Sequence, residues 1–86
     1  MTEEKIGVIH HYFSKVGVAA IKIKQANLSV GETIHIVGAH TDFKQPVQSM
    51  QIDRNPVQMV KAGDDVGIKT KERVREGDIV YKIKEN

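Results

Sequence analysis

The sequence predicts an all-β fold, specifically a small closed antiparallel β-barrel of about six to eight short strands. Three observations support this prediction. Apolar residues alternate with polar ones through most of the chain, and many of them are β-branched. Gly, Pro, Asn and Asp separate these runs at short intervals, and helix signals are nearly absent. Finally, Gly63-Asp64 and Gly77-Asp78 each precede an alternating run, as a turn precedes a strand.

Length and composition indicate one domain over residues 1–86, with its core over residues 5–84. A chain of 86 residues with 40% hydrophobic residues can build one core. It contains no cysteine, so neither a disulfide nor a thiolate metal site is available. The first residues lack the apolar segment of a signal peptide, and no run approaches the roughly 20 apolar residues of a membrane span. We therefore expect a cytoplasmic protein without membrane contact.

Two runs near the N-terminus form the first predicted strands. Residues 6–13 and 16–24 are separated by Ser14-Lys15, and the second run ends in a strict alternation of isoleucine and lysine. Such alternation is typical of a strand with one buried and one solvated face. His10 and His11 are neighbours on the first run, so we expect them on opposite faces.

The middle of the chain predicts a loop, one strand and two further short strands. Gly31 is expected at positive φ in the loop, and residues 34–37 follow as a strand whose two isoleucines share a face. The segment 39–45 is expected to be a polar connection. Pro46 and Pro56 are each expected to be the first residue of a short strand. Proline has no N–H, and the first residue of a strand need not donate a hydrogen bond to the neighbouring strand.

The C-terminal part contains the same pattern twice, a Gly-Asp turn followed by a strand. Gly63 and Gly77 tolerate the left-handed backbone of a tight turn, and Asp64 and Asp78 can accept hydrogen bonds from nearby amides. The first run then places Val66, Ile68 and Thr70 on one face. The second places Ile79, Tyr81 and Ile83 on one face, with Lys82 and Lys84 on the opposite, solvated face.

Four segments in order carry a family resemblance: Val30-Gly31-Glu32, Val47-Gln48-Ser49-Met50, Ala62-Gly63-Asp64 and Gly77-Asp78. With them the chain, over residues 5–83, resembles the β-barrel domain two of translational GTPases such as elongation factor Tu and initiation factor two. It also looks like the small translation elongation factor-like proteins. The resemblance implies a noncatalytic binding module that contacts RNA, the ribosome or a protein partner, without a GTPase domain. A similar barrel is the terminal domain of some U32-family peptidases, which gives an alternative: an accessory barrel that docks on a peptidase-like enzyme.

No catalytic constellation is visible, so we expect no enzyme activity and no cofactor. The segment 63–70 faintly resembles a phosphate loop, but Ile68 separates Gly67 from Lys69 and no helix follows. Nucleotide binding is therefore not predicted. The serines have no motif that places a general base beside them.

Four histidines raise the question of a metal ion. A site would need His10 or His11 together with His35 and His40, and nothing in their spacing brings them together. We therefore predict no metal site, and a histidine-based metal site remains a third alternative.

Basic residues give the one positive prediction of a binding surface. Lys69, Lys71, Arg73 and Arg75 stand at alternate positions and could meet RNA phosphates from one face. Lys22 and Lys24 are a secondary candidate pair. The alternative is a solvated exterior, because the net charge is only +2 and two glutamates interrupt the cluster. The expected partners are tRNA or the ribosome, or else a protein.

Overall fold

The computed structural model describes residues 2–84, and its architecture is all-β, so the predicted fold class is confirmed. This part of the chain contains ten strands and no helix, where the sequence indicated six to eight strands. None of the described residues belongs to a helix long and apolar enough to cross a membrane. The strands are β1 (Thr2–Phe13), β2 (Val18–Ile23), β3 (Asn27–Ser29), β4 (Thr33–Gly38), β5 (Thr41–Pro46), β6 (Met50–Ile52), β7 (Asn55–Val57), β8 (Met59–Lys61), β9 (Asp65–Lys69) and β10 (Ile79–Lys84).

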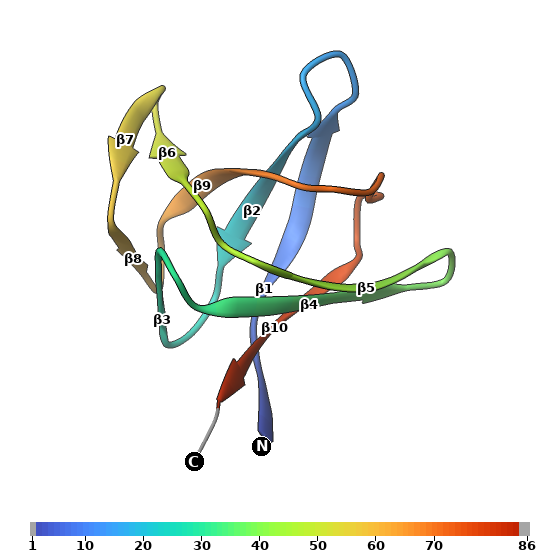
Figure 1. The fold of residues 1–86 in the computed structure, drawn as a ribbon, viewed down its shortest axis with the longest axis horizontal. Helices are drawn as coiled ribbons and strands as arrows, with labels where there is room; N and C mark the ends of the chain where they lie inside the picture. Colours follow the sequence, from blue (N-terminus) through green and yellow to red (C-terminus); the bar gives the residue numbers. More distant parts are fainter. Residues whose placement is uncertain (1, 85–86) are drawn as a thin grey trace.

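Eight of these strands form one antiparallel sheet in the order β5-β4-β10-β1-β2-β9-β6-β7, and β3 pairs with β8 separately. The sheet bends strongly, so that β4 and β5 cross in front of β1 and β2 (Figure 1). It does not close: β5 and β7 remain its two edges. The prediction of a closed barrel is therefore wrong in this respect. The chain leaves β5 through residues 47–49 and enters β6, which pairs with β7 and β9 but not with β5.

Strand β1 contains two bulges that change which side chains face the core. The register shifts between Lys5 and Gly7 against β10, and between Ile9 and His11 against β2. A bulge inserts one extra residue and breaks the alternation of faces. As a result His10 and His11 are both exposed, so the expectation that they occupy opposite faces is wrong.

The segment expected to be a polar connection is strand β5. Its residues alternate between buried and exposed, and the buried ones are Thr41, Phe43 and Gln45. Two of these three are polar, which hid the alternation in the sequence. Pro46 ends β5 and Pro56 is the middle residue of β7, so neither proline opens a strand as expected. Both strands are sheet edges, where proline costs no ladder bond.

Three turns share one hydrogen-bonding pattern, at residues 29–32, 61–64 and 75–78. The third residue of each is a glycine at positive φ: Gly31 at 99°, Gly63 at 98° and Gly77 at 91°. The fourth is Glu32, Asp64 or Asp78, whose amide donates to the carbonyl of the first residue at 3.0–3.1 Å. Its carboxylate in turn accepts the N–H of that first residue at 2.7–2.9 Å. The repeated Gly-acid pairs therefore make turns.

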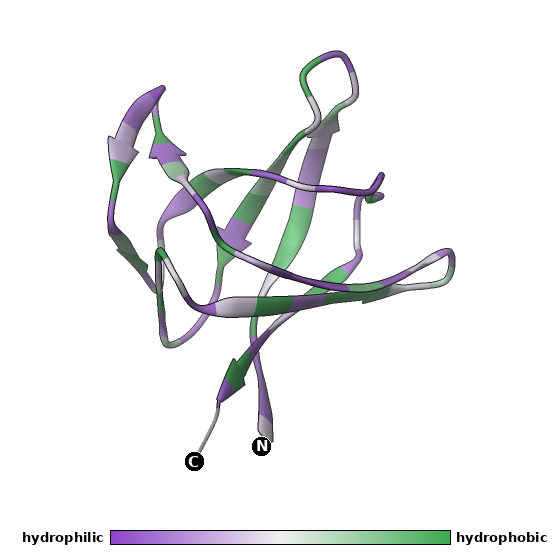
Figure 2. Cartoon of the chain, in the orientation of Figure 1, coloured by the Kyte–Doolittle hydropathy of each residue, from purple (hydrophilic) through white to green (hydrophobic). Residues whose placement is uncertain are grey.

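The core lies between the two crossing halves of the sheet. Hydrophobic and hydrophilic residues alternate along the strands (Figure 2). The buried apolar residues are Ile6, Ile9, Ala19, Ile21, Ile23, Leu28, Ile34, Ile36, Phe43, Val47, Met50, Val60, Val66, Ile68, Val74 and Val80.

Strand β10 presents the opposite face from the one expected. Val80 and Lys82 are buried, and Ile79, Tyr81 and Ile83 are only half-buried. The ammonium of Lys82 donates to the Asn27 carbonyl at 2.7 Å and lies 3.8 Å from the Glu32 carboxylate. The expectation of Lys82 on a solvated face is therefore wrong, because this cation has partners inside the fold.

Candidate functional site

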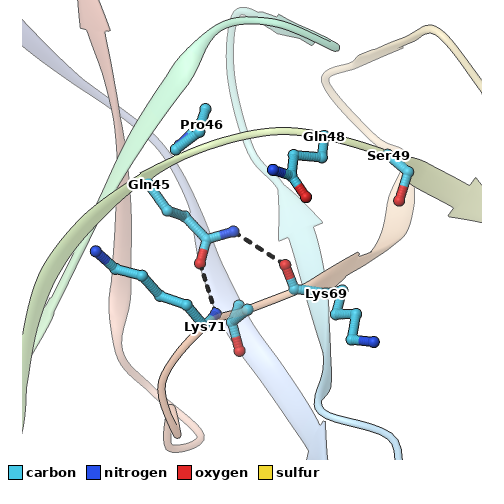
Figure 3. A pocket seen from close by; sticks show the side chains of 7 residues that line it. Gln45, Pro46, Gln48, Ser49, Lys69 and Lys71 are labelled. Carbon is cyan, nitrogen blue, oxygen red and sulfur yellow. Dashed lines mark hydrogen bonds between the residues drawn. The ribbon is translucent and has the colours of Figure 1, made fainter.

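A pocket of about 260 Å³ lies where the sheet fails to close, and we call it the seam pocket. Gln45 and Pro46 end β5 on one side, Gln48 and Ser49 follow, and the end of β9 forms the other side (Figure 3). Its lining residues are Gln45, Pro46, Gln48, Ser49, Lys69, Thr70 and Lys71.

The side chain of Gln45 joins the two sides of this seam. Its Nε2 donates to the Lys69 carbonyl at 2.9 Å, and its Oε1 accepts the Lys71 amide at 2.8 Å (Figure 3). The amide group thus bonds the backbone of two residues on alternate positions, as a neighbouring strand would. We call these two hydrogen bonds the Gln45 bridge. It replaces the backbone ladder that a closed barrel would have at this point.

Two of the predicted basic residues, Lys69 and Lys71, line the seam pocket. Their side chains extend to opposite sides of it (Figure 3). The Lys71 ammonium lies 6.0 Å from the centre of the Phe43 ring, within the range of a cation–π contact. The pocket therefore offers two separate cations at its rim and amide and hydroxyl groups between them.

The other predicted basic residues do not line the seam pocket with Lys69 and Lys71. Strand β9 ends at Lys69, so no strand alternation carries Arg73 and Arg75 onto the same face. These two arginines line a different pocket, of about 230 Å³. On β2, the Lys22 ammonium donates to the Gly63 carbonyl at 3.2 Å and lies 3.6 Å from Asp65, while Lys24 is exposed.

Among the histidines, His35 is held between two carboxylates from β1 and β5. Its Nδ1 lies 2.8 Å from Glu3 Oε1, and its Nε2 lies 2.5 Å from Asp42 Oδ1. The bond to Asp42, opposed by partial burial and supported by Glu3, raises the pKa of His35. When it is protonated, the ring can donate from both nitrogens to the two carboxylates and so link three strands.

Two kinds of chemical site can be checked among the described residues: a nucleophile with its base, and a metal site. The side chains that line the seam pocket include no imidazole and no carboxylate, so Ser49 has no general base there. Within residues 2–84, no three His, Asp or Glu side chains are placed to hold a metal ion together. The histidine-based alternative thus finds no ligand set in this part of the chain.

A second surface, which sequence reasoning missed, lies between two hairpin tips. Phe13 and Val16 of the β1–β2 hairpin are 49% and 60% exposed and flank a groove of about 540 Å³. Its other side carries Asp53 and Arg54 of the β6–β7 turn. We call it the hairpin groove. A signal was available in the sequence, because two large apolar residues bracket Ser14-Lys15 at a predicted turn, where polar residues are the rule.

Comparison with known proteins places the chain beside peptidase domains. No protein-family model matches it. Over 82 residues, 94% of the chain, it is 42% identical to a Methanocaldococcus jannaschii protein named as an uncharacterized protease, and it covers 20% of that protein. Over 73 residues it is 33% identical to a Porphyromonas gingivalis collagenase, again covering 20% of it. The chain thus spans about a fifth of the curated relatives it matches.

A solved structure of a domain from a protein named as a peptidase has a similar fold. The C-terminal domain of a Geobacillus thermoleovorans protein named as a U32 peptidase superposes with a TM-score of 0.87. The alignment covers 94% of this chain and 93% of that domain at 18% identity.

These findings overturn the resemblance to domain two of translational GTPases. The relatives are a protease and collagenases, and the matching fold is that of a U32 peptidase C-terminal domain. The expectation of an RNA-binding translation factor is therefore wrong as well. Contact of Lys69, Lys71, Arg73 and Arg75 with RNA, which the basic residues suggested separately, stays a prediction. The alternative, a barrel-like domain of the kind that accompanies peptidases, fits the comparisons better. The translation-factor reading failed because short Gly-acid turns recur in many small β-folds and do not distinguish between them.

Proposed function

We propose that this chain is a noncatalytic accessory domain that docks on the catalytic part of a peptidase-like protein. One observation carries the proposal: 94% of the chain matches only 20% of a protein named as a protease. The chain thus corresponds to a module of such a protein, and four-fifths of the relative lies outside the match. The extensive apolar core within residues 2–84 supports a module that folds as a unit.

The chemistry of the described residues supports the noncatalytic part of the proposal. Ser49 has no base among the seam pocket residues, and His35 has both ring nitrogens bonded to carboxylates. A nucleophile and a free base within hydrogen-bond reach are the minimum for acyl transfer by a side chain. We therefore expect the isolated chain to leave gelatin and casein uncleaved.

The basic residues take a different role in this proposal. Lys69 and Lys71 are exposed at the rim of the seam pocket, where their ammonium groups could meet carboxylates of a protein partner. Such rim contacts tune the rate and salt dependence of association more than its strength. They are secondary contacts here.

A chimera tests docking directly. The matching fifth of the Methanocaldococcus jannaschii relative is replaced by this chain, and calorimetry compares the chimera with the free chain. A docked domain unfolds at a higher temperature than the free chain, because contact with its partner stabilises only the folded form. We expect a rise of at least about 4 °C, which corresponds to roughly 1 kcal/mol for a domain of this size. A separate transition at the temperature of the free chain would contradict the proposal.

A further inference from the structure

We propose that the hairpin groove is the docking surface, and that it receives an apolar segment of the catalytic part of a peptidase-like partner. This inference rests on the function proposed above and names the surface that performs it. The groove's apolar side and floor are formed by six residues: Phe13, Val16, Val18, Ala20, Val66 and Gly67.

The floor of the groove is hollow because its residues are small. Ala20 of β2 pairs with Gly67 of β9, which pairs in turn with Gln51 of β6. A Cβ atom at Gly67 would lie 3.4 Å from Val18 Cγ1 and 3.8 Å from the Gln51 carbonyl oxygen. The absence of a side chain at Gly67 thus leaves space above the sheet for an inserted group.

The walls of the groove expose large apolar side chains. Among the described residues, the exposed large hydrophobics are Phe13, Val16 and Met59, and two of these three flank this groove. Neighbouring exposed apolar side chains around a concave surface are typical of protein-binding sites. The seam pocket has about half the volume, and two lysines stand at its rim. Covering the hairpin groove would therefore remove more apolar surface from water than covering the seam pocket.

The rim charges indicate the chemistry of the occupant. Asp53, Arg54 and Asp65 border the groove, and Asp65 already lies 3.6 Å from Lys22. A rim with carboxylates and cations of both signs does not attract a polyanion or an anionic membrane, which bind fields of uniformly positive charge. It suits a protein surface of mixed charge. Four-fifths of the protease relative lie outside the match, and we place the occupant there. We expect it to insert an aromatic or branched aliphatic side chain into the hollow.

Hydrogen–deuterium exchange locates the docked surface. The free chain and the chimera are compared, and peptides over residues 13–20 and 51–54 report on the groove, whereas peptides over residues 45–49 and 69–71 report on the seam pocket. We expect exchange over the groove to slow by at least about tenfold in the chimera. The double variant Phe13→Ser, Val16→Ser should restore most of the free-chain rate, because it removes the apolar contacts at the centre of the interface. Met59→Ser is the matched control, since Met59 is 58% exposed and does not line the groove.

The outcomes separate this inference from the proposed function. If the chimera melts at the temperature of the free chain and no peptide is protected, docking itself is refuted. If the chimera is stabilised but protection falls on the seam pocket, or the double variant behaves like Met59→Ser, the domain docks and this surface is wrong. If the free chain protects the groove in proportion to its own concentration, the occupant is a second copy and the inference is overturned. Should the chimera aggregate, the unaltered relative and its isolated matching segment give the same comparison.

Discussion

The Gln45 bridge gives the sharpest prediction about stability. Gln45 is 8% exposed, and its amide holds the end of β9 to the edge strand β5 through two hydrogen bonds. Replacing it by methionine keeps the length and approximate volume of the side chain and removes both bonds. Without the bridge, these two side-chain hydrogen bonds no longer hold β5 to the end of β9.

The magnitude follows from the two bonds and the exposure of their partners. A neutral hydrogen bond contributes about 0.5–1.5 kcal/mol, so the two together contribute about 1–3 kcal/mol. Lys69 and Lys71 are exposed residues, and water can reach their backbone groups once the bridge is gone. The larger penalty for buried unpaired groups therefore does not apply in full. We expect Gln45→Met to lower the free energy of unfolding by about 2 kcal/mol and Tm by about 8–16 °C.

Urea unfolding followed by far-ultraviolet circular dichroism measures this change. Gln48→Met is the matched control, because Gln48 lines the same pocket but is exposed and outside the bridge. We expect that control to stay within about 0.5 kcal/mol of the wild type. An equally small effect of Gln45→Met would refute the claim that this side chain substitutes for a backbone ladder. Exchange of the Lys71 amide with deuterium should also accelerate in Gln45→Met alone, since that amide loses its acceptor.

Three further predictions concern other parts of the fold. The pKa of His35 is raised in the folded chain, so its contribution to stability is present near pH 6 and is lost as the pH rises through that pKa; Tm should fall from pH 6 to pH 9 by more in the wild type than in His35→Gln. Gly7→Ala should cost about 1–3 kcal/mol in urea unfolding, because the new Cβ would clash with the Lys22 carbonyl oxygen. Lys82→Met should cost about 1–3 kcal/mol in the same assay, since it leaves a carbonyl and a carboxylate without their cation.

Each of these predictions has a control in the chain. His40→Gln makes the same substitution at an exposed histidine outside the contacts of His35 with Glu3 and Asp42, and is the matched control. Gly67→Ala tests the Gly7 argument, because its Cβ would meet its neighbours at 3.4 Å or more. Lys24→Met tests the Lys82 argument with an exposed lysine. Equal effects of variant and control would count against the physical reason given in each case.

Local pattern was sufficient for several parts of this structure. In β2 the alternation of Ile21 and Ile23 with lysine predicted which face is buried, and β4 and β9 follow the same rule. The turns at Gly63 and Gly77 were also predictable, because a glycine at positive φ and an acidic side chain that caps its own turn need only four consecutive residues. In both cases the determining interactions lie within a few residues of each other.

The candidate sites depended on contacts that no local pattern contains. The seam pocket forms because β5 and β9, which are separate in the sequence, approach without pairing, and Gln45 bridges them over 24 and 26 residues. The hairpin groove forms where two hairpin tips lie on either side of Gly67. Basic residues that alternate in the sequence from Lys69 onward do not share a face, because the strand ends there.

By itself, then, the sequence determined the all-β class, the faces of the strictly alternating strands and the positions of the Gly-acid turns. The tertiary structure alone decided that the sheet stays open, that a bulge in β1 lies at its neighbouring histidines, and that β10 turns Val80 and Lys82 inward. Each of these features depends on contacts between residues that are far apart in the sequence, and Lys82 of β10 is an example. A lysine at an inward position is stable only if distant residues supply its partners, and here Asn27 and Glu32 do so from 55 and 50 residues away.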